Sequence, residues 1–406
     1  MGCSPGAVPA PVIAPECPAG AHSGRIRGKS EIRMSESIGT QDIKEHLRKD
    51  ISDLVAIPSP SGRENAVSDH VERRLKETGL NPNRDEHGNV WVETGAGGKR
   101  LHANAHLDTV VPVDGWKGDP FKPRLEGDRL YGLGASDCKG GVAALLMLAP
   151  RVKPGVRVIF SFTVCEEGVD LPKPNGSELM AALGGDWALA CEPTCDESGP
   201  LIAVGTQGHA RAEVTFKGVA AHSSVPEDGR NAIHAAAAFC TDLEKMNASY
   251  VVKEIAPGAR ARATVAPTVI AGGKLSNNIP DECRVTVSRR LAPGEEIADF
   301  ESELNRLIEG RDAVYEIASD GAGALADMKG ALLGAARKAS MDTGGGGRLW
   351  FARGRTDAII YARAGMDTLT LGPGQLGQCH VANEYIDLGP AAKCVVLLEK
   401  LINSLR

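Results

Sequence analysis

The sequence predicts an α/β domain into which a second, ferredoxin-like α+β domain is inserted. Apolar strand-like runs alternate with amphipathic helices near both ends of the chain, which is typical of an α/β sheet covered by helices. Between these two parts the elements follow a β-α-β-β-α-β order. The expected boundaries are a disordered tail at 1–40, α/β segments at 41–204 and 319–406, and the inserted domain at 205–318.

Hydrophobic periodicity places the elements of the α/β domain. Ile43, Leu47 and Ile51 recur at helical spacing, and the Pro-Ser-Pro-Ser-Gly run at 58–62 ends that helix. Val67, Val71 and Leu75 lie on one face of a second helix. Further helices are expected at Val142–Leu148, Lys329–Ala339, Thr356–Ala364 and Ala391–Leu405. Strands are expected at Val90–Glu93, Leu101–Leu107, Val156–Val164, Trp187–Cys191 and Thr368–Leu371.

The inserted domain has a different texture. Polar and apolar residues alternate along its predicted strands, as on a sheet with one exposed face. The predicted elements in chain order are Arg211–Phe216, helix Asn231–Met246, Thr264–Ile270, Arg284–Arg290, helix Glu295–Glu309 and Ala313–Ile317.

Composition excludes several classes of protein. The net charge of −6 and the dispersed Lys and Arg residues argue against a nucleic-acid partner. No apolar stretch approaches the roughly 18 residues of a membrane span. The ten cysteines form no Cys-x-x-Cys pair and fit a reduced, cytoplasmic protein. Residues 1–33 lack both a signal-peptide core and the Ser or Thr of a myristoylation motif, so we interpret them as a tail.

Acids and histidines stand at the ends of several predicted strands. In an open α/β sheet, the carboxyl ends of the strands meet at one edge, where ligands bind. A His-x-Asp or Glu-Glu pair alone is more often an ordinary polar feature, but here the elements recur together, and acids interrupt apolar runs where an unpaired charge is costly. The set comprises His106, Asp108, Asp137, Glu166, Glu167, Glu192 and His380.

These residue types suit a site with two metal ions. Two zinc ions about 3.5–4 Å apart need a bridging carboxylate and terminal His or carboxylate ligands. Hydrolysis also needs a base that is not a ligand. The neighbouring Glu166 and Glu167 can divide the roles of base and ligand.

The motifs resemble those of the zinc-dependent family that includes acetylornithine deacetylase, succinyl-diaminopimelate desuccinylase and glutamate carboxypeptidase. They are Ala-His106-Leu-Asp108, Tyr131-Gly-Leu-Gly-Ala-Ser-Asp137-Cys-Lys-Gly-Gly, Glu166-Glu167, Glu192-Pro-Thr, and Gly-Pro-Gly followed by His380. The likeness covers nearly all of residues 41–405. It implies a zinc-exopeptidase-like catalytic domain with a lid domain that forms a homodimer.

The resemblance also implies roles for these residues. His106 and Glu192 would bind one zinc ion, and Glu167 and His380 the other, with cobalt as a substitute metal. Asp137 would bridge both ions. Asp108 would hydrogen-bond His106 and fix its tautomer. Glu166 would be the general base.

Further candidates come from the same resemblance. His222, in Gly218-Val-Ala-Ala-His222-Ser-Ser, would reach the active site of a neighbouring subunit. Asn278 and Arg290 match positions that bind substrate carboxylates, and Arg355 and Thr356 match a substrate-contacting segment. Arg suits a carboxylate because its guanidinium donates two parallel hydrogen bonds.

The preferred function is hydrolysis of the amide bond of an N-acyl amino acid, as in acetylornithine deacetylase or succinyl-diaminopimelate desuccinylase. A dipeptidase or carboxypeptidase of the same family is the alternative, and a non-catalytic metal-binding relative is a third. A serine hydrolase is disfavoured because no Gly-x-Ser-x-Gly motif occurs. Cys138 stands where Met is usual, and the loop after Glu167 departs from the family pattern, which leaves the acyl group open.

Overall fold

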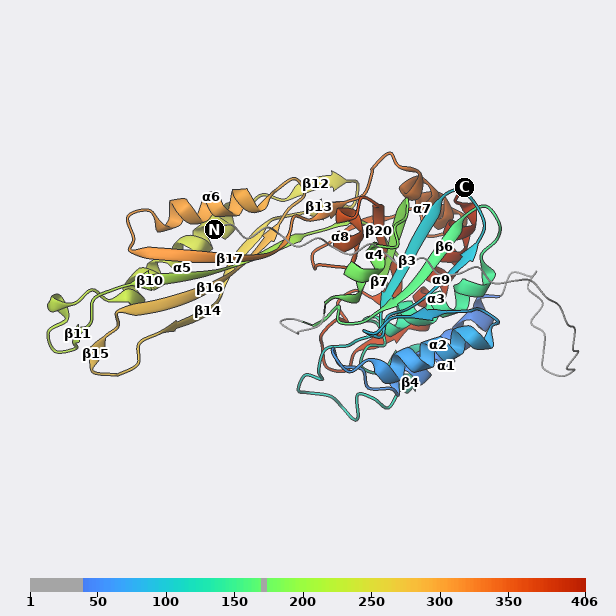
Figure 1. The fold of residues 1–406 in the computed structure, drawn as a ribbon, viewed down its shortest axis with the longest axis horizontal. Coiled ribbons are helices and arrows are strands. Elements are labelled where there is room, and N and C mark those ends of the chain that lie inside the picture. Colours follow the sequence, from blue (N-terminus) through green and yellow to red (C-terminus); the bar gives the residue numbers. More distant parts are fainter. Residues whose placement is uncertain (1–38, 169–173) are drawn as a thin grey trace, which may run out of the picture. The chain divides into compact units, whose positions relative to one another are not determined.

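The computed structural model describes residues 39–168 and 174–406 (Figure 1). The tail expected at 1–40 thus lies almost entirely outside the described residues, as does most of the loop after Glu167. Helix α1 (Thr40–Val55) already begins within the range expected for the tail.

The larger sheet has the strand order β1-β2-β6-β3-β7-β20-β9-β18. Its central strands β6, β3, β7 and β20 run parallel to one another, so that their carboxyl ends meet at one edge. The strands are β1 (Asn83–Arg84), β2 (Val90–Gly95), β3 (Arg100–His106), β6 (Arg157–Thr163), β7 (Trp187–Asp196), β9 (Ile202–Thr206), β18 (Ala324–Leu325) and β20 (Asp367–Gln375). Off this path, β8 (Gly199–Pro200) pairs with β7 and β19 (Leu349–Ala352) pairs with β9.

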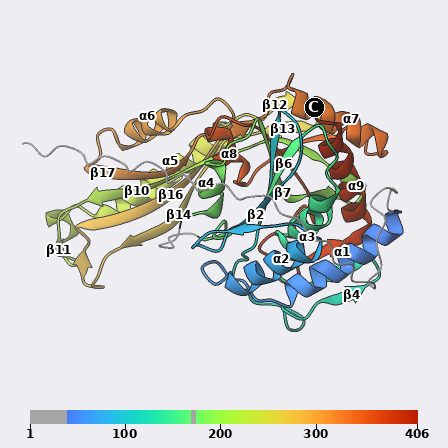
Figure 2. The same ribbon diagram turned by 45° about the vertical axis from the view of Figure 1, so that its right-hand side comes forward.

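Helices cover both faces of this sheet. Helices α1, α3 and α9 pack together on one face, and α4 and α8 lie on the other (Figure 2). The apolar stripe predicted for the first helix is buried, with Leu47 and Ile51 fully covered. The helices are α2 (Asn65–Glu77), α3 (Lys139–Leu148), α4 (Gly176–Ala181), α7 (Ala331–Asp342), α8 (Ala358–Arg363) and α9 (Leu388–Ser404).

The second sheet is antiparallel and has the order β14-β16-β10-β17. Its elements follow the chain as β10 (Gly208–Lys217), α5 (Ala232–Ser249), β14 (Thr264–Gly272), β16 (Glu282–Leu291), α6 (Ile297–Ile308) and β17 (Ala313–Gly321). This is the ferredoxin-like order, so the predicted fold class is confirmed. A separate hydrophobic core lies between this sheet and its helices, and it includes Phe216, Phe239 and Phe300.

Short strands complete the fold. A three-stranded sheet joins β4 (Arg124–Glu126), β5 (Arg129–Tyr131) and β21 (Tyr385–Asp387). In the inserted region, β11 (Ala221–His222) pairs with β15 (Asn278–Ile279), and β12 (Lys253–Ala256) pairs with β13 (Ala259–Ala261). The domain boundaries given above remain predictions.

The packing of α3 against β7 predicts the effect of one substitution. A Cβ atom at Gly141 would meet the carbonyl oxygen of Cys191 at 2.1 Å, whereas a Cβ atom at Gly334 in α7 would meet nothing within 4 Å. We expect Gly141→Ala to lower the free energy of unfolding by about 1–3 kcal/mol through overpacking. Gly334→Ala should raise it by about 0.5–1 kcal/mol, because alanine is the better helix former. Urea denaturation of both variants tests this, and equal stabilities would contradict the packing described.

Candidate functional site

The parallel strands deliver the predicted site residues to one edge of the sheet. His106 is the last residue of β3, Glu166 and Glu167 follow the end of β6, and Glu192 lies in the second half of β7. Because β3 pairs in parallel with both β6 and β7, these side chains are carried to neighbouring positions. Asp137 enters from the loop before α3, and His380 from the loop after β20.

One group of donor atoms joins Asp137, Glu167 and His380. One ligand atom from each lies within 4.8 Å of the others. The Nε2 atom of His380 is 2.7 Å from Oε1 of Glu167 and 3.7 Å from Oδ2 of Asp137. These three residues come from three separate loops, which the sheet brings together.

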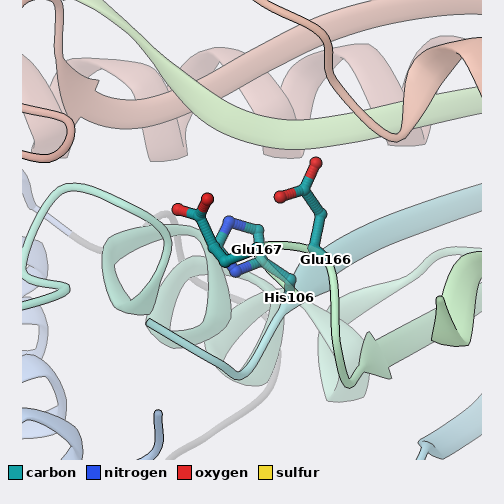
Figure 3. A group of neighbouring side chains, drawn as sticks. All are labelled: His106, Glu166 and Glu167. Carbon is teal, nitrogen blue, oxygen red and sulfur yellow. The ribbon is translucent and has the colours of Figure 1, made fainter. Parts of the chain in front are cut away.

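A second group joins His106, Glu166 and Glu167, again with one atom from each within 4.8 Å (Figure 3). The Nε2 atom of His106 is 3.1 Å from Oδ1 of Asp137. The two carboxylate oxygens of Asp137 therefore face different histidines, Oδ1 toward His106 and Oδ2 toward His380. This places Asp137 between the two groups.

Glu192 belongs to neither group of donor atoms among the described residues. Its Oε1 atom accepts a hydrogen bond from the backbone N–H of Asp357, at 3.2 Å. The charges of His106 and Asp137 nevertheless act on its pKa, so Glu192 lies in the same electrostatic environment.

Negative charge is concentrated in this site. Burial raises the pKa of Glu166 well above its usual value, and the carboxylates of Asp357 and Glu192 raise it further. Burial likewise raises the pKa of Glu192, and Asp137 and Asp357 add to the shift. Several acids thus share a space in which they repel one another, and a bound cation would relieve that repulsion.

Asp108 holds the strand ends together. Its buried carboxylate accepts hydrogen bonds from the backbone N–H groups of Glu166 at 3.1 Å and Glu167 at 2.9 Å, and from Oγ of Ser61 at 2.6 Å. The Nδ1 atom of His106 is closer to the backbone carbonyl oxygen of Asp108, at 3.0 Å, than to its Oδ1, at 3.5 Å. The backbone of residue 108 therefore makes the shorter contact that orients the His106 ring.

Two buried carboxylates that the sequence analysis did not single out also contact these loops. Glu64 accepts hydrogen bonds from the backbone N–H groups of Gly62 and Cys165, next to the Glu166-Glu167 pair. Glu384 accepts hydrogen bonds from three backbone N–H groups of the loop that carries Asp137. Glu384 could have been found from the sequence, because it lies four residues after the predicted ligand His380. Glu64 stands in no motif that points to the site.

Among the described residues, His222 belongs to neither group of donor atoms. His222 and Asn278 sit opposite each other in the β11–β15 pair, and Nδ1 of His222 is 2.7 Å from Oγ of Ser224. Arg290 lies on β16 and is partly buried, as is Arg355. Thr356 is buried, and its hydroxyl contacts that of Thr370.

A buried network of polar side chains joins β3, β6 and Asp357. The carboxylate of Asp357 accepts hydrogen bonds from Nδ2 of Asn104 at 3.0 Å and from Oγ of Ser177 at 2.5 Å. The carbonyl oxygen of the Asn104 side chain accepts from Oγ of Ser161, and that Oγ is 2.7 Å from Nε2 of His102. Because this Oγ donates to Asn104, it accepts from Nε2 of His102. Burial lowers the pKa of His102 to about 3, so its ring is neutral at pH 7.

The donor set fits metal ions of the zinc type. Imidazole nitrogens and carboxylate oxygens are the ligands that zinc takes in hydrolytic sites. The residue common to the two groups is Glu167, and the two oxygens of Asp137 face different histidines. The geometry of Asp137 fits a carboxylate shared between two ions. The fold and the site together define a metal-dependent hydrolase built on an α/β sheet.

The chain belongs to peptidase family M20/M25/M40, whose family model matches residues 102–404. It is therefore a hydrolase that acts on amide bonds, in a family that includes dinuclear metal-binding peptidases. The family resemblance inferred from the motifs is confirmed.

Three relatives illustrate the comparison. A Mycobacterium tuberculosis (strain ATCC 25618 / H37Rv) protein provisionally named succinyl-diaminopimelate desuccinylase DapE is 31% identical, over 86% of this chain and 96% of its own. A Staphylococcus aureus tripeptidase structure matches with a TM-score of 0.71 and 20% identity, over 89% of this chain and 98% of that chain. The Bacillus subtilis YXEP structure, a dinuclear metal-binding M20 peptidase, has a TM-score of 0.68 and 18% identity with the same coverage of each chain.

The buried His102 predicts a loss of stability in acid. Its pKa is about 3 when folded and about 6.5 when unfolded, so the unfolded chain binds the proton more tightly. Stability is therefore fully present above the unfolded pKa and is lost as the pH falls toward 3. Between pH 7 and 5, the titration of His102 alone should lower the free energy of unfolding by roughly 2 kcal/mol.

The test is urea denaturation of the wild type and of His102→Gln at pH 7, 6 and 5, both in excess chelator. The stability of the variant should fall less steeply with acid than that of the wild type. Parallel pH dependences would contradict a neutral, buried His102.

Proposed function

We propose that this protein hydrolyses the amide bond of an N-acyl amino acid, with an N-succinyl amino acid such as N-succinyl-diaminopimelate as the preferred substrate. The observation that carries the proposal is the position of Asp137, whose two oxygens face His106 and His380. The desuccinylase name of the 31% identical relative supports the choice of acyl group.

In this proposal, the site would hold two zinc ions. His106 and Glu192 would bind one, Glu167 and His380 would bind the other, and Asp137 would be shared by both. The mutual proximity of Asp137, Glu167 and His380 supports the second ligand set directly. The influence of His106 and Asp137 on the pKa of Glu192 supports the first.

When bound, the ions would polarise the scissile carbonyl and make water a better nucleophile at neutral pH. The side chain of Glu166 takes a proton from the attacking water and then delivers it to the leaving nitrogen. The partial burial of its side chain suits a group that must hold that proton between the two steps. Asp108 keeps Glu166 in reach by binding its backbone N–H.

Neutral polar and cationic side chains would bind the carboxylates of the substrate. The proposed contacts are Asn278, Arg290, Arg355 and Thr356, and Arg353 lies two residues before Arg355. Two arginines in the segment before α8 favour an acyl group that ends in a carboxylate, such as succinyl, over acetyl. A peptidase activity of the same family is the competing outcome.

Glu166 should be essential for turnover but not for zinc binding. Glu166→Gln should bind zinc as the wild type does and lose at least about a hundredfold in kcat, because the amide accepts no proton from water. Turnover is measured with N-succinyl-diaminopimelate, N-acetylornithine and simple dipeptides, each with chelator and with zinc or cobalt restored. Glu399→Gln, a carboxylate of α9 paired with Arg151, is the control and should keep full activity.

Full activity in Glu166→Gln would contradict the role of base. Metal-dependent cleavage of dipeptides alone would replace the desuccinylase with a peptidase. No turnover of any substrate, with two zinc ions bound, would favour a non-catalytic relative.

We also propose a homodimer formed through the inserted lid domain, in the cytoplasm. Strand β14 is an edge of its sheet, and Val269 and Ile270 on it are 57% and 53% exposed. An apolar, unpaired edge strand is a ready surface for a second copy of the chain.

The eight described cysteines are free, as in a reducing compartment. No helix among the described residues is both long and apolar enough to cross a membrane.

Mixed dimers test whether His222 acts across that interface. His222→Ala and Glu166→Ala chains should each be nearly inactive alone. Random mixing makes half of the dimers hybrid, each with one intact site, so the mixture should regain about a quarter of wild-type activity. Subunits are exchanged after mild dissociation, and turnover is measured before and after. No recovery in hybrids verified by mass spectrometry would show that His222 does not serve the neighbouring subunit.

A further inference from the structure

Glu384 is an acid buried in the wall of the site, with 2% of its surface exposed. Its Oε2 atom accepts the backbone N–H of Gly134 at 2.8 Å. Its Oε1 atom accepts those of Ser136 at 2.8 Å and Asp137 at 3.0 Å. Both carboxylate oxygens therefore serve the backbone of the loop from which Asp137 points into the site.

The same short segment carries a second predicted ligand, because His380 lies only four residues before Glu384. Two further bonds join the loops. The backbone N–H of Gly132 donates to the carbonyl oxygen of Glu384 at 3.0 Å, and Oγ of Ser136 donates to that of Tyr385 at 2.8 Å. The loops that present Asp137 and His380 are thus held as one unit.

Lys139 holds the Asp137 loop from another side. It is fully buried, and its Nζ atom donates to the carbonyl oxygens of Leu54 at 3.0 Å and Ile57 at 2.9 Å, at the end of α1. The loop is therefore anchored to α1 through Lys139 and to the His380 segment through Glu384. Of these two links, the one through Glu384 connects two predicted ligands.

A carboxylate is the suitable side chain for this link. Both of its oxygens can accept hydrogen bonds, whereas the nitrogen of an amide of the same shape cannot, so an amide must turn a donor toward at least one of the three N–H groups. The bond to the backbone of Asp137 limits the directions in which the Asp137 side chain can point.

We propose that Glu384 is a positioning residue that sets the zinc affinity of the site made by Asp137, Glu167 and His380. The inference rests on the proposed function in that it takes these three residues as metal ligands. Glu384 acts through the backbone of Asp137 and the segment of His380, and it touches neither metal nor substrate.

The test compares Glu384→Gln with Asp50→Asn. Asp50 is also a buried carboxylate, 5% exposed, and it binds Arg74 between α1 and α2. Each substitution disturbs the hydrogen bonds of a buried side chain, so both variants should have a lower Tm. Zinc affinity is measured by competition with a chromophoric chelator, at a temperature where circular dichroism shows both variants folded.

Glu384→Gln should weaken the binding of one or both zinc ions by about 10–100-fold, as is usual for a group that orients a metal ligand. In the metal-free protein, the amides of Gly134, Ser136 and Asp137 should exchange hydrogen faster than in the wild type. Asp50→Asn should change neither property. Ser136→Ala removes the bond to Tyr385 and should weaken zinc binding in the same direction, by less.

Wild-type zinc affinity and unchanged amide exchange in folded Glu384→Gln would overturn the inference and leave the proposed function intact. Weakened zinc binding in that variant, with no turnover by the wild type on any substrate, would support the inference and contradict the proposed function. A wild type that binds no zinc would overturn both.

Discussion

The site depends on one electrostatic constraint, which is that several carboxylates converge at the carboxyl ends of parallel strands. Glu166 and Glu192 respond with a raised pKa, because burial and neighbouring negative charges oppose their ionisation. Such an arrangement is unfavourable unless protons or cations balance it. Two divalent ions would supply that balance and the reactivity of the enzyme together. The same repulsion between carboxylates that is unfavourable in the metal-free protein would therefore favour the binding of metal ions.

The loops at this edge are held by acids that face backbone rather than metal. Asp108 binds the N–H groups of Glu166 and Glu167, Glu64 binds that of Cys165, and Glu384 binds that of Asp137. Backbone N–H groups carry no net charge. These hydrogen bonds therefore hold the loops in place without adding positive charge to the site. The ligands are thereby placed before any ion arrives, which reduces the ordering that metal binding requires.

Local pattern was enough to predict the fold and the candidate set. The apolar runs ending at His106 and before Glu166 identified the strands, and the acids beyond them identified the edge. The supports were not predictable, because they join distant segments; Glu384 and Ser136 are 248 residues apart. The contact between His106 and the carbonyl of residue 108 depends on backbone direction, which motifs do not report. Strands β9 and β19 (Leu349–Ala352) were not predicted, because each short apolar run stands beside glycines that indicate a loop.

The most direct measurement is anomalous X-ray diffraction at the zinc edge from crystals of the zinc-loaded protein. The account predicts two peaks about 3.5–4 Å apart, on either side of the Asp137 carboxylate. Glu192 should reach the ion bound by His106, and His380 the other. A single peak, or two peaks that Asp137 does not join, would contradict the two-metal account of this site.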